Sequence, residues 1–81
     1  MARQEILSPL PGTFYRRPNP TADPYVTEGD SVTADQTICL IEIMKQFNEV
    51  KAGVDGKLVE FLVVNEDAVM AGQPIAIIET E

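Results

Sequence analysis

The feature that most constrains the fold of this chain is an internal repeat. When the sequence is shifted by 37 residues, positions 26–42 align with positions 63–79, and eight of the 17 pairs are identical. The identical pairs are Val26/Val63, Asp30/Asp67, Val32/Val69, Ala34/Ala71, Gln36/Gln73, Ile38/Ile75, Ile41/Ile78 and Glu42/Glu79. A shift of 44 residues aligns positions 5–15 with positions 49–59, where Gly12 matches Gly56. The repeat therefore predicts two half-units that pack around a quasi-two-fold axis, each covering the apolar face of the other.

The two shifts differ by seven residues because the first half contains a longer connection. Between the matched segments this connection has ten residues in the first half and three in the second. The additional residues fall in the stretch 16–25, which contains three prolines. Since proline restricts the conformations of an unfolded chain, we expect this stretch to form a defined loop that projects from the body of the protein.

Short apolar segments between glycine and proline turn signals predict strands, and no segment has the spacing of an amphipathic helix. The expected strands are 6–9, 12–16, 37–41, 49–52, 57–64 and 74–79, of which 57–64 is the longest. We therefore expect an all-β fold with the shape of a flattened barrel. A length of 81 residues provides for one domain, 1–81.

The composition excludes several classes of function. A net charge of −7 argues against binding to nucleic acid and to anionic membrane surfaces, both of which attract basic proteins. With no histidine and one cysteine, a zinc site is disfavoured and a histidine-activated nucleophile is excluded. Cys39 lies in an apolar run and is interpreted as a small core residue. No apolar run approaches a membrane span of about 18 residues, and no signal peptide is recognised, which indicates a cytosolic protein.

Lys45 lies at the predicted tip of a hairpin between the apolar segments 37–41 and 47–50. The repeat makes this hairpin the counterpart of the chain ends, so we expect it at the opposite end of the domain from the termini. A lysine in such a place is most often a solvated surface charge. Schiff-base chemistry would need burial or a cationic neighbour to lower the lysine pKa, and an exposed tip supplies neither. The remaining chemical use is as an attachment point for a long flexible arm.

The sequence around Lys45 resembles the biotin-attachment motif E-A-M-K-M of the biotin carboxyl carrier protein family. Here the motif reads Glu42-Ile43-Met44-Lys45-Gln46. The segment 8–16 resembles the opening of that carrier domain in acetyl-CoA carboxylase, and 17–24 matches its protruding thumb in position and character. Two further segments resemble the glycine turns of the family, 28–32 and 54–59.

The resemblance covers residues 5 to 80 and implies the biotinyl/lipoyl carrier fold. This fold is a flattened β-barrel of two four-stranded antiparallel sheets, with a thumb loop at about 16–25 and an attachment hairpin at about 42–48. The resemblance also implies that a biotin protein ligase uses ATP to attach biotin to Lys45. The residues expected beside the cofactor are Glu42, Ile43, Met44 and Gln46 on the hairpin and Pro18, Asn19, Pro20 and Thr21 on the thumb.

In this family a biotin carboxylase carboxylates the biotin, and a carboxyltransferase passes the carboxyl group to an acyl-CoA or a related acceptor. The resemblance therefore implies a non-catalytic carrier that contributes no catalytic residue of its own. We expect a monomer in the cytoplasm, or in the plastid stroma if the chain is an organellar fragment. The resemblance leaves open whether the chain is an excised domain or a small complete subunit.

Two departures from the motif keep alternatives open. Ile43 replaces the alanine and Gln46 replaces the second methionine, and both lie in the turn that a ligase reads. An unmodified scaffold or binding domain of the same fold is therefore one alternative. A lipoyl carrier is another, although such domains usually have aspartate at the position of Met44 and lack the thumb. A free-standing enzyme is disfavoured by the absence of histidine and of a clustered acid pair.

Overall fold

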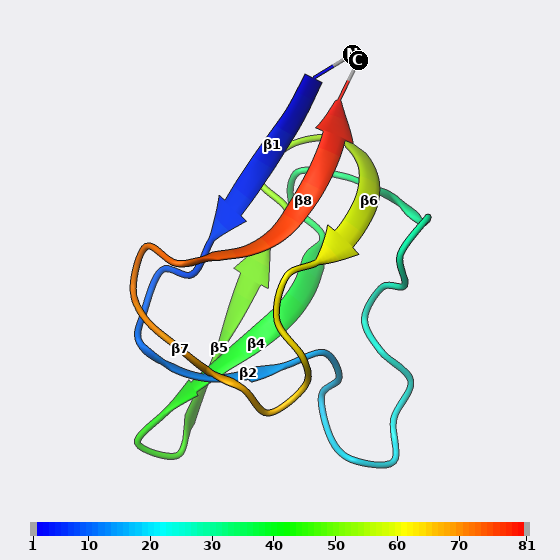
Figure 1. Cartoon of the computed structure of the whole chain (residues 1–81). Helices are drawn as coiled ribbons and strands as arrows, with labels where there is room; N and C mark the ends of the chain where they lie inside the picture. The colour runs from blue at the N-terminus through cyan, green and yellow to red at the C-terminus, as the bar shows by residue number, and fades with distance from the viewer. Residues whose placement is uncertain (1, 81) are drawn as a thin grey trace.

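The fold consists of two antiparallel β-sheets of four strands each. The computed structural model describes residues 2–80, and its strands are β1 (Ala2–Leu7), β2 (Gly12–Tyr15), β3 (Ser31–Val32), β4 (Thr37–Ile43), β5 (Gln46–Lys51), β6 (Gly56–Phe61), β7 (Ala68–Val69) and β8 (Pro74–Thr80). One sheet has the order β1-β8-β6-β3 and the other β5-β4-β2-β7 (Figure 1). The predicted all-β fold with two four-stranded sheets is confirmed. Residues 2–80 contain no helix, and so none that could cross a membrane.

The internal repeat is visible in the strands and in the hydrogen bonds that join the halves. The pair β3 and β4 matches the pair β7 and β8 at the shift of 37 residues. The Gly29 amide donates to the Leu58 carbonyl over 2.8 Å, and the Glu66 amide donates to the Phe14 carbonyl over 2.7 Å. Each half thus bonds one of its turns to a strand of the other half, which is the reciprocal packing that the repeat predicts.

The two glycines matched by the repeat have the same packing role. A β-carbon on Gly12 would collide with the carbonyl oxygen of Glu42, and one on Gly56 would collide with the carbonyl oxygen of Glu79. Strand β2 therefore approaches β4, and β6 approaches β8, more closely than a residue with a side chain would permit at these positions.

Apolar side chains from both sheets fill the space between them. The completely buried members are Phe14, Ile38, Cys39, Ile41, Leu58, Ile75, Ala76 and Ile78. The ring of Phe14 meets that of Phe61 edge to face, with centroids 5.5 Å apart. Cys39 is a core residue, as predicted. Burial raises the pKa of its thiol to about 12, so the thiol stays protonated and unreactive at neutral pH.

The prediction that 57–64 is the longest strand is wrong. Strand β6 ends at Phe61, and the longest strands are β4 and β8 with seven residues each. A turn begins at Val64, whose amide donates to the Asp67 carboxylate over 3.1 Å and whose carbonyl accepts from the Asp67 amide over 3.1 Å. The apolar residues before this turn continue the strand pattern in sequence, but they have left the sheet.

The predicted limits of the first two strands are also wrong. Strand β1 runs over Ala2–Leu7 instead of 6–9, because it pairs with β8 from Ala2 opposite Thr80 onward. This pairing joins the first and last strands, and no local pattern reveals it. Strand β2 ends at Tyr15, because the Arg16 carbonyl accepts a hydrogen bond from the loop that follows.

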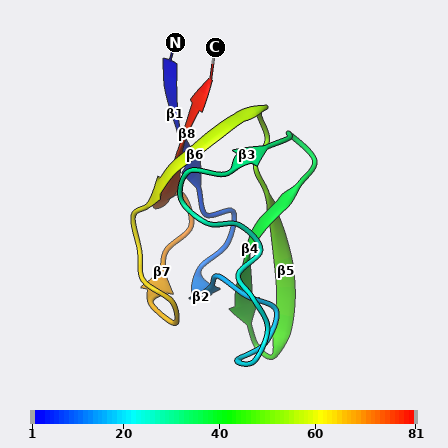
Figure 2. The same cartoon turned by 90° about the vertical axis from the view of Figure 1, so that its right-hand side faces the viewer.

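The β4–β5 hairpin lies at the opposite end of the molecule from the start of β1 and the end of β8 (Figure 1). The loop 16–25, which we call the thumb, extends toward the same end of the molecule as the hairpin (Figure 1 and Figure 2). The placement predicted from the repeat is therefore confirmed, and the thumb lies at the same end of the molecule as the predicted attachment site.

Candidate functional site: the attachment hairpin and the thumb

The tip of the β4–β5 hairpin is a two-residue turn. Ile43 and Gln46 form the last pair of the two strands, and Met44 and Lys45 connect them with φ values of 52° and 67°. Positive φ at both connecting residues defines the type I′ turn, whose twist matches that of the flanking strands. Asparagine and glycine usually occupy such positions, so Met44 and Lys45 adopt a backbone conformation that is strained for residues with a β-carbon.

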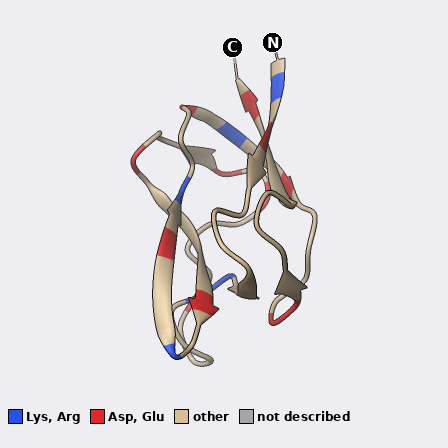
Figure 3. Cartoon of the chain, turned by 90° about the vertical axis from the view of Figure 1, so that its left-hand side faces the viewer, with Lys and Arg blue, Asp and Glu red and all other residues tan. Residues whose placement is uncertain are grey.

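Both turn residues project into solvent. Met44 is 90% exposed, and Lys45 is exposed as well. Within residues 2–80 no ion pair involves Lys45. Figure 3 shows basic colouring at this turn and acidic colouring on both strands of the hairpin. The lysine side chain is therefore exposed at the tip of the turn.

The thumb closes on itself through its own backbone. The Tyr25 amide donates to the Arg16 carbonyl over 2.9 Å, which joins the two ends of the loop. At the tip, the Asn19 carboxamide oxygen accepts from the Thr21 amide over 3.0 Å and from the Thr21 hydroxyl over 2.9 Å. Asparagine is favoured in turns because its side chain forms this kind of local bond. The thumb is thus a defined loop, as its prolines predicted.

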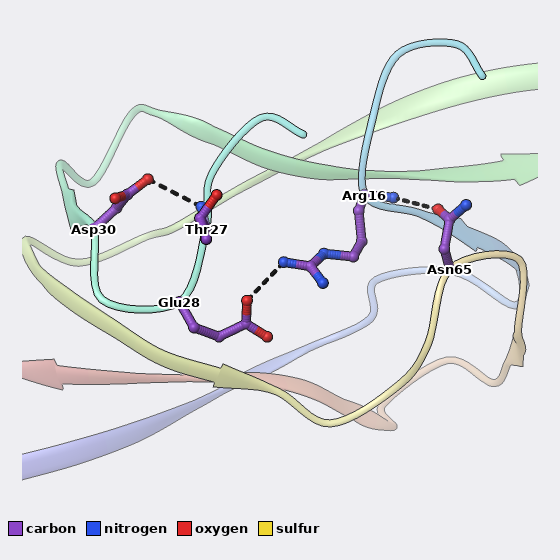
Figure 4. A network of polar contacts seen from close by, with 5 residues as sticks. All are labelled: Arg16, Thr27, Glu28, Asp30 and Asn65. Carbon is purple, nitrogen blue, oxygen red and sulfur yellow. Dashed lines mark hydrogen bonds and ion pairs between the residues drawn. The ribbon is translucent and has the colours of Figure 1, made fainter. Parts of the chain in front are cut away.

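Arg16 anchors the base of the thumb to the body of the protein (Figure 4). Its guanidinium donates to the Glu28 carboxylate over 2.7 Å and lies 4.7 Å from the centroid of the Phe61 ring. Its backbone amide donates to the carboxamide oxygen of Asn65 over 2.9 Å. One residue therefore connects the start of the thumb to three segments that are distant in sequence.

The charge of Glu28 is stabilised in this network. A hydrogen bond from its own backbone amide lowers the pKa of the Glu28 carboxyl most strongly, and the hydrogen bond from Arg16 lowers it further. The neighbouring turn is held in a similar way, because the Thr27 amide donates to the Asp30 carboxylate over 3.0 Å (Figure 4). These bonds keep the anchor of the thumb ionised and in place at neutral pH.

A groove of about 400 Å³ lies between the thumb and the attachment hairpin. The thumb contributes Arg17, Pro18, Asn19 and Pro20 to its wall. The body of the protein contributes Tyr15, Phe47, Asn65 and Glu66. The volume is in the range of small-molecule sites, and the mixture of apolar rings with a few polar groups is typical of them.

The two aromatic residues of the groove lie on the outer face of the sheet that carries the hairpin. Tyr15 pairs with Leu40, and Phe47 pairs with Glu42, two positions further along β4. The rings of Tyr15 and Phe47 are 6.0 Å apart, and the Tyr15 hydroxyl donates to the Glu42 carboxylate over 3.0 Å. This bond to the Glu42 carboxylate is the main reason that the pKa of Tyr15 is raised.

The structure distributes the predicted site residues between two places. Met44, Lys45 and Gln46 are exposed at the hairpin, while Ile43 and Glu42 are half-buried beneath them. In the thumb, Pro18, Asn19 and Pro20 line the groove, and Thr21 instead bonds to Asn19.

The site residues predicted from the sequence did not include Tyr15, Phe47, Asn65 and Glu66, and Arg17 was expected only as part of the thumb segment 17–24. Tyr15 and Phe47 lie in segments that the sequence already predicted to be strands. That they face the same groove can be inferred only when the register of β2, β4 and β5 is known. Asn65 and Glu66 belong to the turn between β6 and β7, and nothing local connects them with the hairpin.

Comparison with known families agrees with this geometry. The sequence model of the biotin/lipoyl attachment family, described as "Biotin-requiring enzyme", matches residues 4–78. The match includes both halves of the repeat, the thumb and the hairpin. The chain belongs to the biotin/lipoyl attachment family.

Within this family the chain is similar to carrier subunits of one class. It is 46% identical over 70 residues to the biotin carboxyl carrier protein of acetyl-CoA carboxylase from Chlamydia trachomatis, covering 86% of this chain and 43% of that protein. The protein of the same name from Pyropia yezoensis is 45% identical over 75 residues, covering 93% of this chain and 48% of that protein. The chain thus spans less than half the length of these relatives.

A solved structure has the same fold. The urea carboxylase of Kluyveromyces lactis superimposes with a TM-score of 0.81 at 29% identity, over 98% of this chain and 6% of that chain. The two-sheet architecture found here is therefore the architecture of a small part of a large carboxylase.

Proposed function

We propose that this chain is the biotin carboxyl carrier domain of acetyl-CoA carboxylase or of a related biotin-dependent carboxylase. Lys45 is the residue that accepts biotin. The observation that carries the proposal is the display of Lys45 at the tip of a two-residue turn in a chain of the biotin/lipoyl attachment family. The domain itself is non-catalytic and delivers a carboxyl group from a biotin carboxylase to a carboxyltransferase.

The residues around Lys45 fit covalently attached biotin. The lysine amine is exposed, so a ligase has access to it without unfolding the hairpin. The groove beside the hairpin offers the apolar surfaces of Pro18 and Phe47 to a ring system and the carboxamides of Asn19 and Asn65 to a polar head. When bound, biotin supplies the ureido nitrogen that accepts and releases the carboxyl group. The chain fixes the origin of the arm and holds the groove in position next to it.

The carrier role requires three partners, namely a biotin protein ligase, a biotin carboxylase and a carboxyltransferase. Attachment to one domain turns each later encounter of the arm into a tethered one, which raises its effective concentration at both active sites. Met44 is 90% exposed and unbranched, so it suits contact with more than one visiting enzyme. We place the domain in the cytoplasm, or in the plastid stroma for an organellar fragment, and we expect it to be monomeric alone.

The two departures from the attachment motif form one structural unit. Ile43 and Gln46 are the pair that closes the turn, with Ile43 half-buried and Gln46 exposed. A ligase approaching Lys45 therefore meets the polar Gln46 beside it, whereas Ile43 supports the turn from below. This arrangement leaves the backbone of the turn intact and confines the change in recognition to one exposed side chain.

Intact-mass spectrometry after co-expression with a biotin ligase and free biotin tests the proposal. We expect a single biotinyl addition, which disappears in Lys45→Arg because arginine cannot form the amide. Lys51→Arg serves as the matched control and should be fully biotinylated. A lipoyl addition would identify the alternative carrier. An unmodified chain, when a known carrier is labelled in parallel, would contradict the proposal and favour a scaffold role.

A further inference from the structure

One positively charged side chain lines the groove between the thumb and the hairpin. Arg17 lines it from the thumb, and Glu66 lines it from the turn between β6 and β7. The chain has six lysine and arginine residues against 13 aspartate and glutamate residues, and Arg17 is the one of the six that lines this groove. Arg17 lines the same groove as Phe47, which belongs to the hairpin that carries Lys45. A group attached to Lys45 is therefore the first ligand to consider for this groove.

Among residues 2–80, Arg17 takes part in no ion pair, and one of its guanidinium nitrogens is buried without a partner. Its Nε is buried and has no hydrogen-bond acceptor. The ion pairs found among residues 2–80 involve Arg3, Arg16 and Lys51, and none involves Arg17. The Nε of Arg16 is also unpaired, but that guanidinium is held by Glu28 and by the ring of Phe61. A buried donor without an acceptor is costly, so Arg17 is the group in this groove that a ligand would satisfy.

We propose that the groove is a carboxylate-binding site, with Arg17 as its anion-binding residue, and that its occupant is the carboxyl group carried on the Lys45 arm. This inference rests on the proposed function. Arginine presents its N–H donors in a planar fork that matches the two oxygens of a carboxylate. The arm without its carboxyl group has no anion to offer, so Arg17 makes the groove selective for the loaded carrier.

The geometry brings the arm within reach. Phe47 lines the groove and follows Lys45 by two residues, which corresponds to about 7 Å along a strand. The lysine side chain with its attached biotin is longer than that. The Glu66 carboxylate on the same groove repels free anions in solution, whereas a tethered carboxylate is present at high effective concentration. The site therefore retains the carried group in transit without collecting other carboxylates.

Amide chemical shifts of the domain in three states test this proposal. The states are unmodified, biotinylated as confirmed by intact mass, and loaded by a biotin carboxylase with ATP and bicarbonate. In the wild type we expect loading to shift the amides of Asn19, Phe47 and Asn65 beyond any shift caused by biotin alone. In Arg17→Gln the additional shifts should disappear, while in Arg17→Lys, which keeps the charge but loses the fork, they should be reduced.

Arg3→Gln removes an exposed arginine and serves as the control, in which the loading shifts should remain unchanged. Loading shifts that are absent in the wild type, or that are equal in Arg17→Gln, would overturn the carboxylate site while leaving the carrier function intact. Saturable shifts of the same amides when acetate is added to the unmodified domain would overturn the assignment to the tethered group. If intact mass shows that the chain takes no biotin, the proposed function is overturned. The carboxylate site then has no tethered group to bind, and this outcome is distinct from the loss of loading shifts in a biotinylated chain.

Discussion

At the scale of single residues, the proposed attachment site depends on two residues in a conformation that they rarely adopt. Met44 and Lys45 have φ values of 52° and 67°, and each such residue costs about 1–3 kcal/mol unless its surroundings hold it there. The paired strands β4 and β5 provide that support up to the pair Ile43 and Gln46. Among residues 2–80 the third non-glycine residue with positive φ is Glu66 at 73°, in the turn between β6 and β7, so within the hairpin the strain lies at the two turn residues.

Replacing Met44 by asparagine should relieve part of this strain, because asparagine tolerates the left-handed region. We expect Met44→Asn to raise the free energy of unfolding by about 1 kcal/mol, measured by urea denaturation. Met70→Asn is the matched control, since Met70 is 68% exposed and is not among the residues with positive φ. An equal effect in both variants would show that backbone strain at the turn is not the cause.

The hairpin could be predicted from sequence, but the type of its turn could not. Two strand-like segments with a lysine between them indicated a reversal at Lys45. The dipeptide Met44-Lys45 carries none of the asparagine or glycine signals of a type I′ turn. The turn has this geometry because the strands pair as far as Ile43 and Gln46 and leave two residues to connect them.

At the scale of the structural element, the thumb is held at its base more than along its length. The Arg16 side chain joins Glu28 and Phe61, and the Arg16 backbone joins Tyr25 and Asn65. The tip has only local bonds within the loop. The orientation of the thumb over the groove therefore depends mainly on one arginine.

Arg16→Ala should release the thumb while leaving the core intact. We expect faster hydrogen exchange at the Tyr25 amide and a loss of about 1 kcal/mol in stability, since both a cation–π contact and an ion pair are removed. Arg3→Ala removes an exposed ion pair at the other end and should leave exchange in the thumb unchanged. Unchanged exchange at Tyr25 in Arg16→Ala would contradict the role of this anchor.

The same anchor should respond to pH. Because the pKa of Glu28 is lowered in the folded state, its contribution to stability is present above the ordinary glutamate pKa and is lost as the pH falls through the lowered value. Exchange at Tyr25 in the wild type should therefore rise in acid, once the intrinsic pH dependence of exchange is subtracted. Glu28→Gln should abolish this rise.

The existence and length of the thumb followed from the repeat, whereas its anchors did not. Arg16, Glu28, Phe61 and Asn65 come from segments that only the folded sheets bring together. The groove residues Tyr15 and Phe47 depend in the same way on strand register. Sequence reasoning could locate the elements of this site, but it could not locate the contacts between them.

At the scale of the whole molecule, the repeat determines how the two halves pack and at which end of the domain the lysine turn lies. Two half-units cover each other, and an 81-residue chain thereby buries an apolar core from two four-stranded sheets. The described chain measures 37 × 27 × 20 Å, with the lysine turn at one end and the first and last strands at the other (Figure 1). A group attached to Lys45, as we propose, would therefore extend away from the first and last strands.

The most direct test of the carrier function is the transfer of labelled bicarbonate to the biotinylated domain by a biotin carboxylase and ATP. We predict that the domain acquires the label at Lys45, that Lys45→Arg acquires none, and that the label passes on when a carboxyltransferase and its acceptor are added. A domain that is fully biotinylated at Lys45 but acquires no label, when a known carrier does so in parallel, would contradict the proposal that this chain carries a carboxyl group.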